Sequence, residues 1–225
     1  MNSVVCKKIS HRYKNAFVEE KVLEDIDLTL EKGKIYCLLG PSGSGKTTLL
    51  NIMGGLLNPS DGEVFIEGED ITKYNEDQLA SLRVNKIGYI FQNYNLIPFL
   101  NVKDNIFLQH RIAGNDISSK MELYKRIVTR LGLDGKENSY ADQLSGGQQQ
   151  RVAIARCLIM EPSIILADEP TGNLDAENTN VFIRLIKDVM KGQDTTFVIV
   201  THDERLCEYC DHVIRLFDHK IQYVS

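Results

Sequence analysis

The sequence predicts an α/β fold with a mostly parallel sheet, antiparallel strands near the amino end and an inserted helical segment. The first 35 residues alternate apolar and polar side chains in short stretches, which is typical of antiparallel strands. Continuous apolar runs return at 35–39, 164–166, 196–200 and 213–217, and such runs are typical of buried parallel strands. Helical patterns separate several of these runs, which favours an α/β core.

The composition is that of an ordinary globular protein. The 225 residues are 43% hydrophobic and 25% charged, and this length suits one large domain or one domain with an insertion. The net charge of -5 argues against a general nucleic-acid binder. The longest apolar runs fall well short of the roughly 20 residues of a membrane span, and no signal segment opens the chain. We therefore expect a cytosolic protein that reaches a membrane only through a partner.

The cysteines indicate reduced thiols. Their number is odd and no export signal is present, which disfavours a disulfide framework. Cys207 and Cys210 have the CxxC spacing, but a zinc site needs two more ligands and no second pair exists. We interpret this pair as two thiols one helical turn apart that face a core.

A glycine-rich loop follows the first apolar strand. Strand 35–39 runs directly into loop 40–47, and 47–57 continues with leucines at helical spacing. A turn at 58–62 and a short strand at 63–66 come next. Strand, glycine loop and helix form the context of a phosphate-binding loop.

The chemistry of this loop suits phosphate. Its glycines let backbone N–H groups approach phosphate oxygens, and the following helix points its positive end at the same anion. Lys46 adds charge for the β- and γ-phosphates, and Thr47 offers a hydroxyl to magnesium. The sequence therefore predicts nucleotide binding, with contacts from Gly40, Pro41, Ser42, Gly43, Ser44, Gly45, Lys46, Thr47 and Thr48.

Two carboxylates end the apolar strand that starts at residue 164. In a parallel sheet this carboxyl edge is where ligands bind, so we expect Asp168 to hold magnesium, directly or through water. Glu169 is placed to polarise a water for attack on the γ-phosphate. The alternative is a strand followed by a solvated acidic turn.

Gln92 and His202 also follow apolar strands. A lone histidine after a strand is more often incidental than catalytic, but a third parallel strand brings His202 to the edge that carries Glu169. Its neutral imidazole can hydrogen-bond the γ-phosphate and the attacking water. Gln92 can reach magnesium and water as a neutral ligand.

A second anion-binding surface lies in the helical insertion. Helices are predicted at 102–112 and 121–133, and a further amphipathic helix near 178–190. Residues 144–148, Leu-Ser-Gly-Gly-Gln, place a serine and two glycines at the start of another helix. One chain thus carries two different phosphate receptors.

Together these residues resemble the nucleotide-binding subunit of an ATP-binding-cassette (ABC) transporter, from about Tyr13 to the last residues. The order of motifs is the family's: Walker A 40–47, Q-loop Gln92, signature 144–148, Walker B 164–168 with Glu169, D-loop 173–175 and switch His202. The resemblance implies a P-loop NTPase (RecA-like) core in one ABC ATPase domain, 1–225. The core and β subdomain are expected at about 1–92 and 160–225, and the helical signature subdomain at about 93–159.

The resemblance also implies ATP hydrolysis with Mg²⁺ in a homodimer whose subunits face head to tail. ATP bound to one subunit is then covered by Ser145, Gly146 and Gly147 of the other. The implied catalytic residues are Glu169, His202 and Gln92; the metal ligands are Thr47, Gln92 and Asp168; the further nucleotide contacts are Gln148, Asp175 and Tyr13, the last of them stacked on adenine.

Within the family, segments 91–96, 148–151 and 166–175 are similar to the MacB and LolD group. That resemblance implies an integral-membrane permease of the FtsX/MacB type, an accessory periplasmic or extracellular adaptor, and export or extraction of a lipoprotein, peptide or antibiotic. The ATPase then lies peripherally on the inner face of the cell membrane. Candidates for the docking groove, expected to be exposed, are Tyr94, Leu96, Pro98 and Phe99; the alternative is ordinary packing.

Other classes stay open. The FtsE-like cell-division ATPase usually has glutamate where Gln149 stands, and a bacitracin-resistance type is also close. A soluble ABC-type ATPase acting on nucleic acid carries a long coiled coil, for which the roughly 50 residues between Gln92 and Leu144 are too few; the ribosome-acting class usually has two cassettes. A small-molecule P-loop kinase has no need of 144–148. A non-catalytic scaffold has no need of Glu169 or His202.

Overall fold

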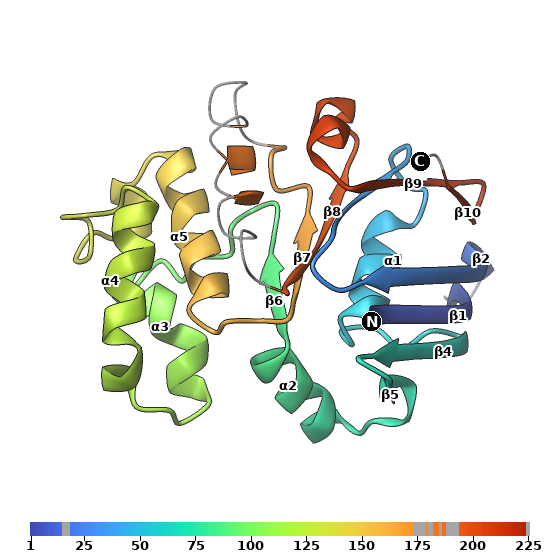
Figure 1. The fold of residues 1–225 in the computed structure, drawn as a ribbon, viewed down its shortest axis with the longest axis horizontal. Coiled ribbons are helices and arrows are strands. Elements are labelled where there is room, and N and C mark those ends of the chain that lie inside the picture. Colours follow the sequence, from blue (N-terminus) through green and yellow to red (C-terminus); the bar gives the residue numbers. More distant parts are fainter. Residues whose placement is uncertain (15–18, 173–178, 180–181, 185, 188–193, 224–225) are drawn as a thin grey trace.

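The computed structural model of the chain describes residues 1–14, 19–172, 179, 182–184, 186–187 and 194–223. Two β-sheets and a group of helices form the molecule, and Figure 1 shows the helical group at one end and the antiparallel sheet at the other. No helix among these described residues combines the length and apolar character that a membrane span requires.

The amino-terminal strands form an antiparallel sheet, as the alternating pattern predicts. Its order is β2-β1-β4-β5. The two leading strands each span 13 residues and pair along most of their length, so they are longer than the short stretches in the sequence suggest. The strands are β1 (Asn2–Lys14), β2 (Glu19–Glu31), β4 (Asp61–Ile66) and β5 (Glu69–Asp70).

The second sheet is parallel apart from one edge hairpin. Its order is β10-β9-β3-β8-β7-β6, and only the β10–β9 pair is antiparallel. The predicted mostly parallel sheet is therefore confirmed. The strands are β3 (Ile35–Leu39), β6 (Ile87–Ile90), β7 (Ile164–Asp168), β8 (Thr196–Thr201), β9 (His212–Phe217) and β10 (Lys220–Tyr223).

Both faces of the parallel sheet are buried, which explains its continuous apolar strands. Ile164 and Leu166 of β7 join one core cluster together with α1 (Lys46–Met53) and the antiparallel sheet. Ile165 and Ala167, one residue out of phase, join a second cluster with the helical group. The central strands thus connect the two halves of the molecule.

The inserted helices leave the sheet after β6 and return at β7. The predicted helix 102–112 matches the structure, while α1 and α4 end before the predicted 57 and 133 because glycines with left-handed backbone, Gly55 and Gly132, follow them. Helix α2 was not predicted, since it buries only Leu79 and Leu82. The helices inserted between β6 and β7 are α3 (Val102–Ile112), α4 (Met121–Arg130) and α5 (Gly146–Leu158), with the 3₁₀ turns η2 (Ile117–Lys120) and η3 (Ala141–Gln143). Outside this insertion lie α2 (Glu76–Asn85) and the 3₁₀ turns η1 (Ile71–Lys73) and η4 (Glu204–Tyr209).

All five cysteines are free thiols, as expected. Cys207 Sγ lies 3.8 Å from Cys37 Sγ, and Cys210 Sγ donates to the Leu206 carbonyl at 3.3 Å. Both are partly buried at the end of η4, and Cys210 packs against the second core cluster. Within the described part of the chain, no group of three or more His, Cys, Asp or Glu side chains could hold a metal ion.

Two glycines of the loop between β3 and α1 serve different purposes. Both have left-handed backbone, with φ of 79° at Gly43 and 98° at Gly45. A Cβ at Gly45 would lie 2.8 Å from Val22 Cγ1 and 2.9 Å from the Val22 carbonyl oxygen, whereas a Cβ at Gly43 would meet no described atom within 4 Å. Gly45 therefore allows the loop to pack closely against β2, whereas Gly43 lies on the open side of the loop.

We predict that Gly45→Ala lowers the free energy of unfolding more than Gly43→Ala does. Both substitutions carry the left-handed backbone penalty of about 1–2 kcal/mol, but only alanine at 45 also overpacks the Val22 backbone, at about 1–3 kcal/mol more. Urea denaturation of the nucleotide-free proteins measures the difference. Equal losses in the two variants would contradict the seating of the loop on β2.

Candidate functional site

The candidate site lies where three parallel strands end. Leu39 at the end of β3 pairs with Thr201 at the end of β8, and Asp168 at the end of β7 pairs with Val200. The glycine loop, the two carboxylates and His202 therefore leave the sheet at the same level. This is the carboxyl edge, where open α/β sheets bind ligands.

The phosphate-binding loop closes around its own lysine. Lys46 Nζ donates to the carbonyl oxygens of Gly40 at 2.8 Å and Pro41 at 2.9 Å. Burial lowers the pKa of the Lys46 amine, and the charges of Glu169 and Asp168 oppose that shift. Gly45 is the residue before the first turn of α1 and carries no side-chain cap, so the backbone N–H groups at this helix end are available to an anion.

Thr47 and Asp168 meet directly at this edge. Thr47 Oγ1 donates to Asp168 Oδ1 at 3.0 Å. Burial raises the pKa of the Asp168 carboxyl, and Glu169 raises it further, while Thr47 and Lys46 lower it. A hydroxyl, a partly buried carboxylate and the carboxamide of the exposed Gln92 are hard oxygen donors of the kind Mg²⁺ prefers, so the residues present fit this ion.

Glu169 is held by residues at the end of the neighbouring strand β8. Its backbone N–H donates to the Val200 carbonyl at 2.8 Å, and its φ of 44° is left-handed. His202 Nδ1 lies 3.0 Å from Glu169 Oε1; because a carboxylate only accepts, the proton of this contact sits on Nδ1. Glu169 Oε2 is buried without a hydrogen-bond partner among the described residues. A buried acceptor without a protein partner is open to a hydrogen bond from a bound ligand or water.

A cavity of about 280 Å³ opens beside the loop. Tyr13 at the end of β1 is half exposed, and its hydroxyl lies 3.2 Å from Thr48 Oγ1, which ties the ring to the loop. The cavity places this aromatic ring next to the phosphate-binding backbone, as a nucleotide base requires. Its lining residues are Tyr13, Glu20, Val22, Gly43, Ser44, Gly45, Lys46, Thr47 and Thr48.

The signature residues do not line this cavity. They begin α5, which Figure 1 shows in the helical group, across the parallel sheet from α1. Ser145 caps the helix: its Oγ accepts from the Gln148 N–H at 3.3 Å, and its own N–H donates to Gln148 Oε1 at 2.9 Å. The side chain of Gln148, predicted to contact nucleotide, thus completes a capping box. Exposed Ser145 and Gly146 present the positive end of α5 to the outside.

The structure brings together most of the predicted site. The loop, Asp168, Glu169 and His202 share one sheet edge, and Gln92 approaches Gly172, which follows the acidic pair. Asp175 lies outside the described residues, as does most of the predicted helix 178–190. Tyr94, which the sequence analysis expects to be exposed, is buried, so that expectation was wrong.

The docking candidates divide into two kinds. Tyr94 is buried, and Leu96 packs against the helical core cluster, which supports packing as the explanation for these two residues. Phe99 is 78% exposed and Pro98 is also exposed. Only these last two remain available to a partner.

Sequence reasoning missed two polar residues of α5 that hold neighbouring loops. Gln150 donates to the carbonyl of Pro170, directly after the acidic pair. Arg156 donates to the carbonyls of Tyr94 and Asn95, just past Gln92. A signal was present, because Arg156 is a charged residue within the apolar run 152–159, and buried charges require partners.

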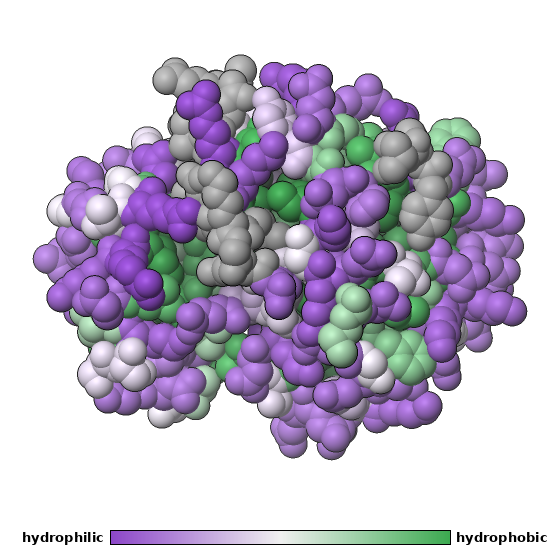
Figure 2. Space-filling view, in the orientation of Figure 1, coloured by the Kyte–Doolittle hydropathy of each residue, from purple (hydrophilic) through white to green (hydrophobic). Residues whose placement is uncertain are grey.

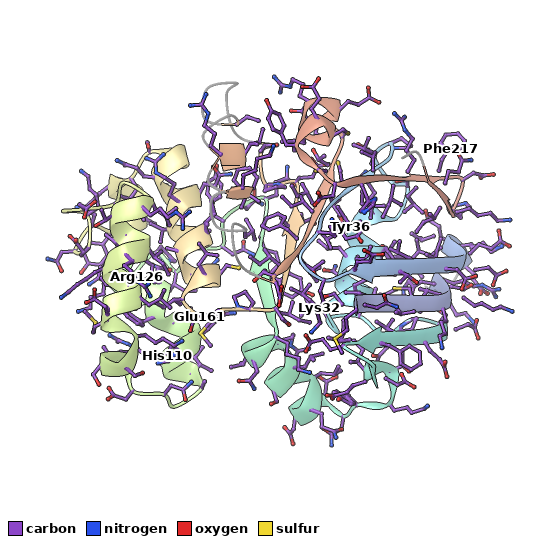
Figure 3. The ribbon with its side chains drawn as sticks, in the orientation of Figure 1. Lys32, Tyr36, His110, Arg126, Glu161 and Phe217 are labelled. Atoms are coloured by element: carbon purple, nitrogen blue, oxygen red, sulfur yellow. The ribbon has the colours of Figure 1, made fainter. Side chains whose placement is uncertain are left out.

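A second cavity lies away from these residues. It measures about 290 Å³ between α4 and the start of β7, and apolar side chains form much of its wall. Figure 2 shows apolar atoms in a hollow over the helical group. Figure 3 shows Arg126 and Glu161, both of which line the cavity, on this side of the molecule. None of the predicted site residues lines this second cavity. The cavity beside the phosphate-binding loop is therefore the candidate nucleotide site, because its lining has the chemistry that phosphate requires.

Comparison with known proteins identifies relatives of this chain. A family model for ABC transporters matches residues 23–172. The chain is 43% identical over 207 residues to the lipoprotein-releasing system ATP-binding protein LolD 1 of Rhodopseudomonas palustris, covering 91% of each chain. It is 38% identical over 224 residues to the macrolide export ATP-binding/permease protein MacB of Syntrophobacter fumaroxidans, covering 99% of this chain and 31% of that protein.

The fold is similar to a solved cassette. The dimeric structure of the bacterial ABC transporter cassette MJ0796 superposes with a TM-score of 0.90 at 34% identity, covering 99% of both chains. The same cassette in a post-hydrolysis state with ADP and phosphate gives a TM-score of 0.89. The predicted P-loop core with an antiparallel β subdomain and the resemblance to the LolD and MacB group are therefore confirmed. This chain belongs to the ABC transporter family and is an ATPase of that family, which converts ATP and water to ADP and phosphate.

Proposed function

We propose that two copies of this chain pair head to tail around two ATP molecules and drive a membrane permease of the FtsX/MacB-like type. One observation carries the proposal. The phosphate-binding loop and the capped start of α5 are both anion-binding surfaces, yet they belong to separate parts of one molecule. A second copy supplies the missing half of each site. The dimeric form of MJ0796 supports this arrangement.

In the proposed site the loop backbone and the end of α1 hold the phosphates. Tyr13 provides the face for adenine, and Thr48 fixes that ring through its hydroxyl contact. Lys46 exchanges its two loop carbonyls for phosphate oxygens. Thr47, Asp168 and Gln92 would hold Mg²⁺, which when bound neutralises charge on the β- and γ-phosphate oxygens.

Glu169 and His202 act on the attacking water. Glu169 polarises the water as general base, and His202 orients the carboxylate through the contact at Oε1. The buried Oε2 is the oxygen without a partner, so it is the one we assign to the water. Ser145, Gly146 and Gly147 of the opposing copy cover the γ-phosphate, with Gln148 fixing the cap and Asp175 completing the interface.

Closure and opening of the dimer follow from the different affinities of ATP and ADP for the closed state. ATP contacts both copies through its γ-phosphate, whereas ADP lacks this group, so ATP favours the closed dimer and hydrolysis reopens it. We assign the exposed Phe99 and Pro98 to the surface through which a permease follows this movement. The proposed complex exports or extracts a lipoprotein, peptide or antibiotic, with the help of an accessory adaptor outside the membrane. The ATPase itself lies on the cytoplasmic face of the membrane.

The other functional class is an FtsE-like ATPase that regulates the cell wall through a similar permease. The ATPase site is the same in both cases, so copurification of the native complex from solubilised membranes separates them. A permease with a large external domain that binds cargo supports extraction. A permease bound to cell-division proteins supports the regulatory class.

The Glu169→Gln variant tests the catalytic base. We expect ATP binding to be retained while steady-state turnover falls at least about 100-fold, the usual range for loss of a general base. Phosphate release measures turnover, and equilibrium binding measures the nucleotide affinity. Turnover close to that of the unmodified protein would remove Glu169 from this role.

The Ser145→Arg variant tests the lid in trans. An arginine at this exposed cap blocks the approach of a second copy but lies away from the chain's own nucleotide cavity. We expect unchanged ATP binding by the monomer and loss of ATP-dependent dimerisation in light scattering. Ser119→Arg adds the same charge at an exposed position of η2 and should dimerise normally. Normal closure in Ser145→Arg would contradict the trans lid.

Asp168→Asn tests the magnesium site. We expect the Mg²⁺ concentration for half-maximal turnover to rise about tenfold or more, because a charged oxygen ligand becomes neutral. Asp142→Asn removes an exposed carboxylate next to the signature and serves as the control. An unchanged Mg²⁺ dependence in Asp168→Asn would place the ion elsewhere.

A further inference from the structure

The turn just past Gln92 holds two residues in an unfavourable backbone conformation. Tyr94 has φ of 57° and Asn95 has φ of 47°. Asparagine tolerates the left-handed region, but a bulky residue such as tyrosine seldom adopts it. Such conformations persist only when the surrounding structure imposes them, and they gather at switch regions. The turn therefore needs a neighbour that holds it.

Arg156 is that neighbour. Its guanidinium donates to the Asn95 carbonyl through Nη1 and to the Tyr94 carbonyl through Nη2, both at 2.6 Å. The side chain is only 8% exposed, and a buried guanidinium has to place its donors on acceptors. Arg156 lies near the end of α5, so the helix that begins with the signature also fixes the turn behind Gln92.

The side chain of Tyr94 reaches the other end of the same helix. Its ring is buried, and its hydroxyl is 3.7 Å from the position that a Cβ on Gly146 would occupy. Gly146 is the first residue of α5. The hydroxyl has no hydrogen-bond partner among the described residues. A buried hydroxyl without a partner is unfavourable, and here it faces the positive end of a helix.

The turn is also tied to the nucleotide edge. Gln92 precedes Tyr94 by two residues, and its carboxamide nitrogen would lie 3.2 Å from a Cβ on Gly172. The Gly172 N–H donates to the Glu169 carbonyl at 3.1 Å. The turn therefore lies between the nucleotide edge and α5, which it approaches at both ends.

We propose that Tyr94 and Arg156 are positioning residues that couple Gln92 in one subunit to the signature it presents to the other subunit's ATP. In the open monomer the turn keeps its strained backbone and its unpaired hydroxyl. When ATP draws Gln92 inward, Arg156 moves α5 with the turn, and the Tyr94 hydroxyl gains a partner in the closed dimer. This inference rests on the proposed head-to-tail dimer.

A purely structural role for Tyr94 makes a different prediction. If the ring only fills space, Tyr94→Phe should stabilise the fold by removing a buried unpaired hydroxyl and leave closure unchanged. If the hydroxyl gains a partner on closure, the same substitution stabilises the monomer and weakens the dimer. The two effects then have opposite signs.

The test uses the 225-residue chain with Glu169→Gln, which we expect to retain bound ATP. We expect Tyr94→Phe in this background to unfold at a higher urea concentration and to bind ATP as a monomer with unchanged affinity. The ATP concentration for half-maximal dimerisation should rise about tenfold, the effect of losing one hydrogen bond in the closed state. Tyr124→Phe is the matched control, because the Tyr124 hydroxyl on α4 is also buried without a described partner; it should gain stability and dimerise normally.

Arg156→Lys tests the second half of the coupling, since lysine cannot donate to both carbonyls in the fork geometry of arginine. It should also weaken dimerisation, whereas Arg126→Lys on the exposed side of α4 (Figure 3) should not. Unchanged dimerisation in Tyr94→Phe, or an equal loss in Tyr124→Phe, would overturn the coupling. Failure of the Glu169→Gln parent to dimerise with ATP would instead overturn the proposed function.

Discussion

The register of three parallel strands is the constraint on which the site depends. Pairing of Leu39 with Thr201, and of Asp168 with Val200, brings the glycine loop, the acidic pair and the switch histidine to one level. The alternation of Ile164 and Ile165 between two core clusters fixes this register, because a slip by one residue would move every apolar side chain to the wrong cluster. Chemistry at the edge is thus secured by packing deep in the sheet.

The sequence predicts what depends on local pattern. Apolar runs followed by charge locate β3, β7 and β8, and the site residues follow directly from their ends. Helix α2 has too little apolar surface to be recognised, since it buries only Leu79 and Leu82. The burial of Tyr94 depends on where α5 packs, and the contact between Glu169 and His202 depends on side-chain orientation. Such long-range contacts leave no periodic signal in the sequence.

Two of the buried polar atoms that lack a partner within the described part of the chain belong to residues near the proposed sites. Glu169 Oε2 lies at the carboxyl edge of the sheet and the Tyr94 hydroxyl lies near the start of α5, and both are buried without partners among the described residues. Glu169, Tyr94 and Asn95 also have left-handed backbone. Strain and unpaired polar atoms are retained where a structure has to change state. In the proposed mechanism, ATP and a second copy relieve these unfavourable groups when the dimer closes.

The central claim is that one active site contains residues from two chains. The most direct measurement mixes two variants that each retain Glu169→Gln: one carries Lys46→Ala and the other Ser145→Arg. Each variant alone lacks one half of every site, but the mixed pair has one complete site. The account predicts that light scattering detects ATP-dependent dimers in the mixture and in neither variant alone. Absence of dimers from the mixture, while the parent protein dimerises, would contradict a site shared between two chains.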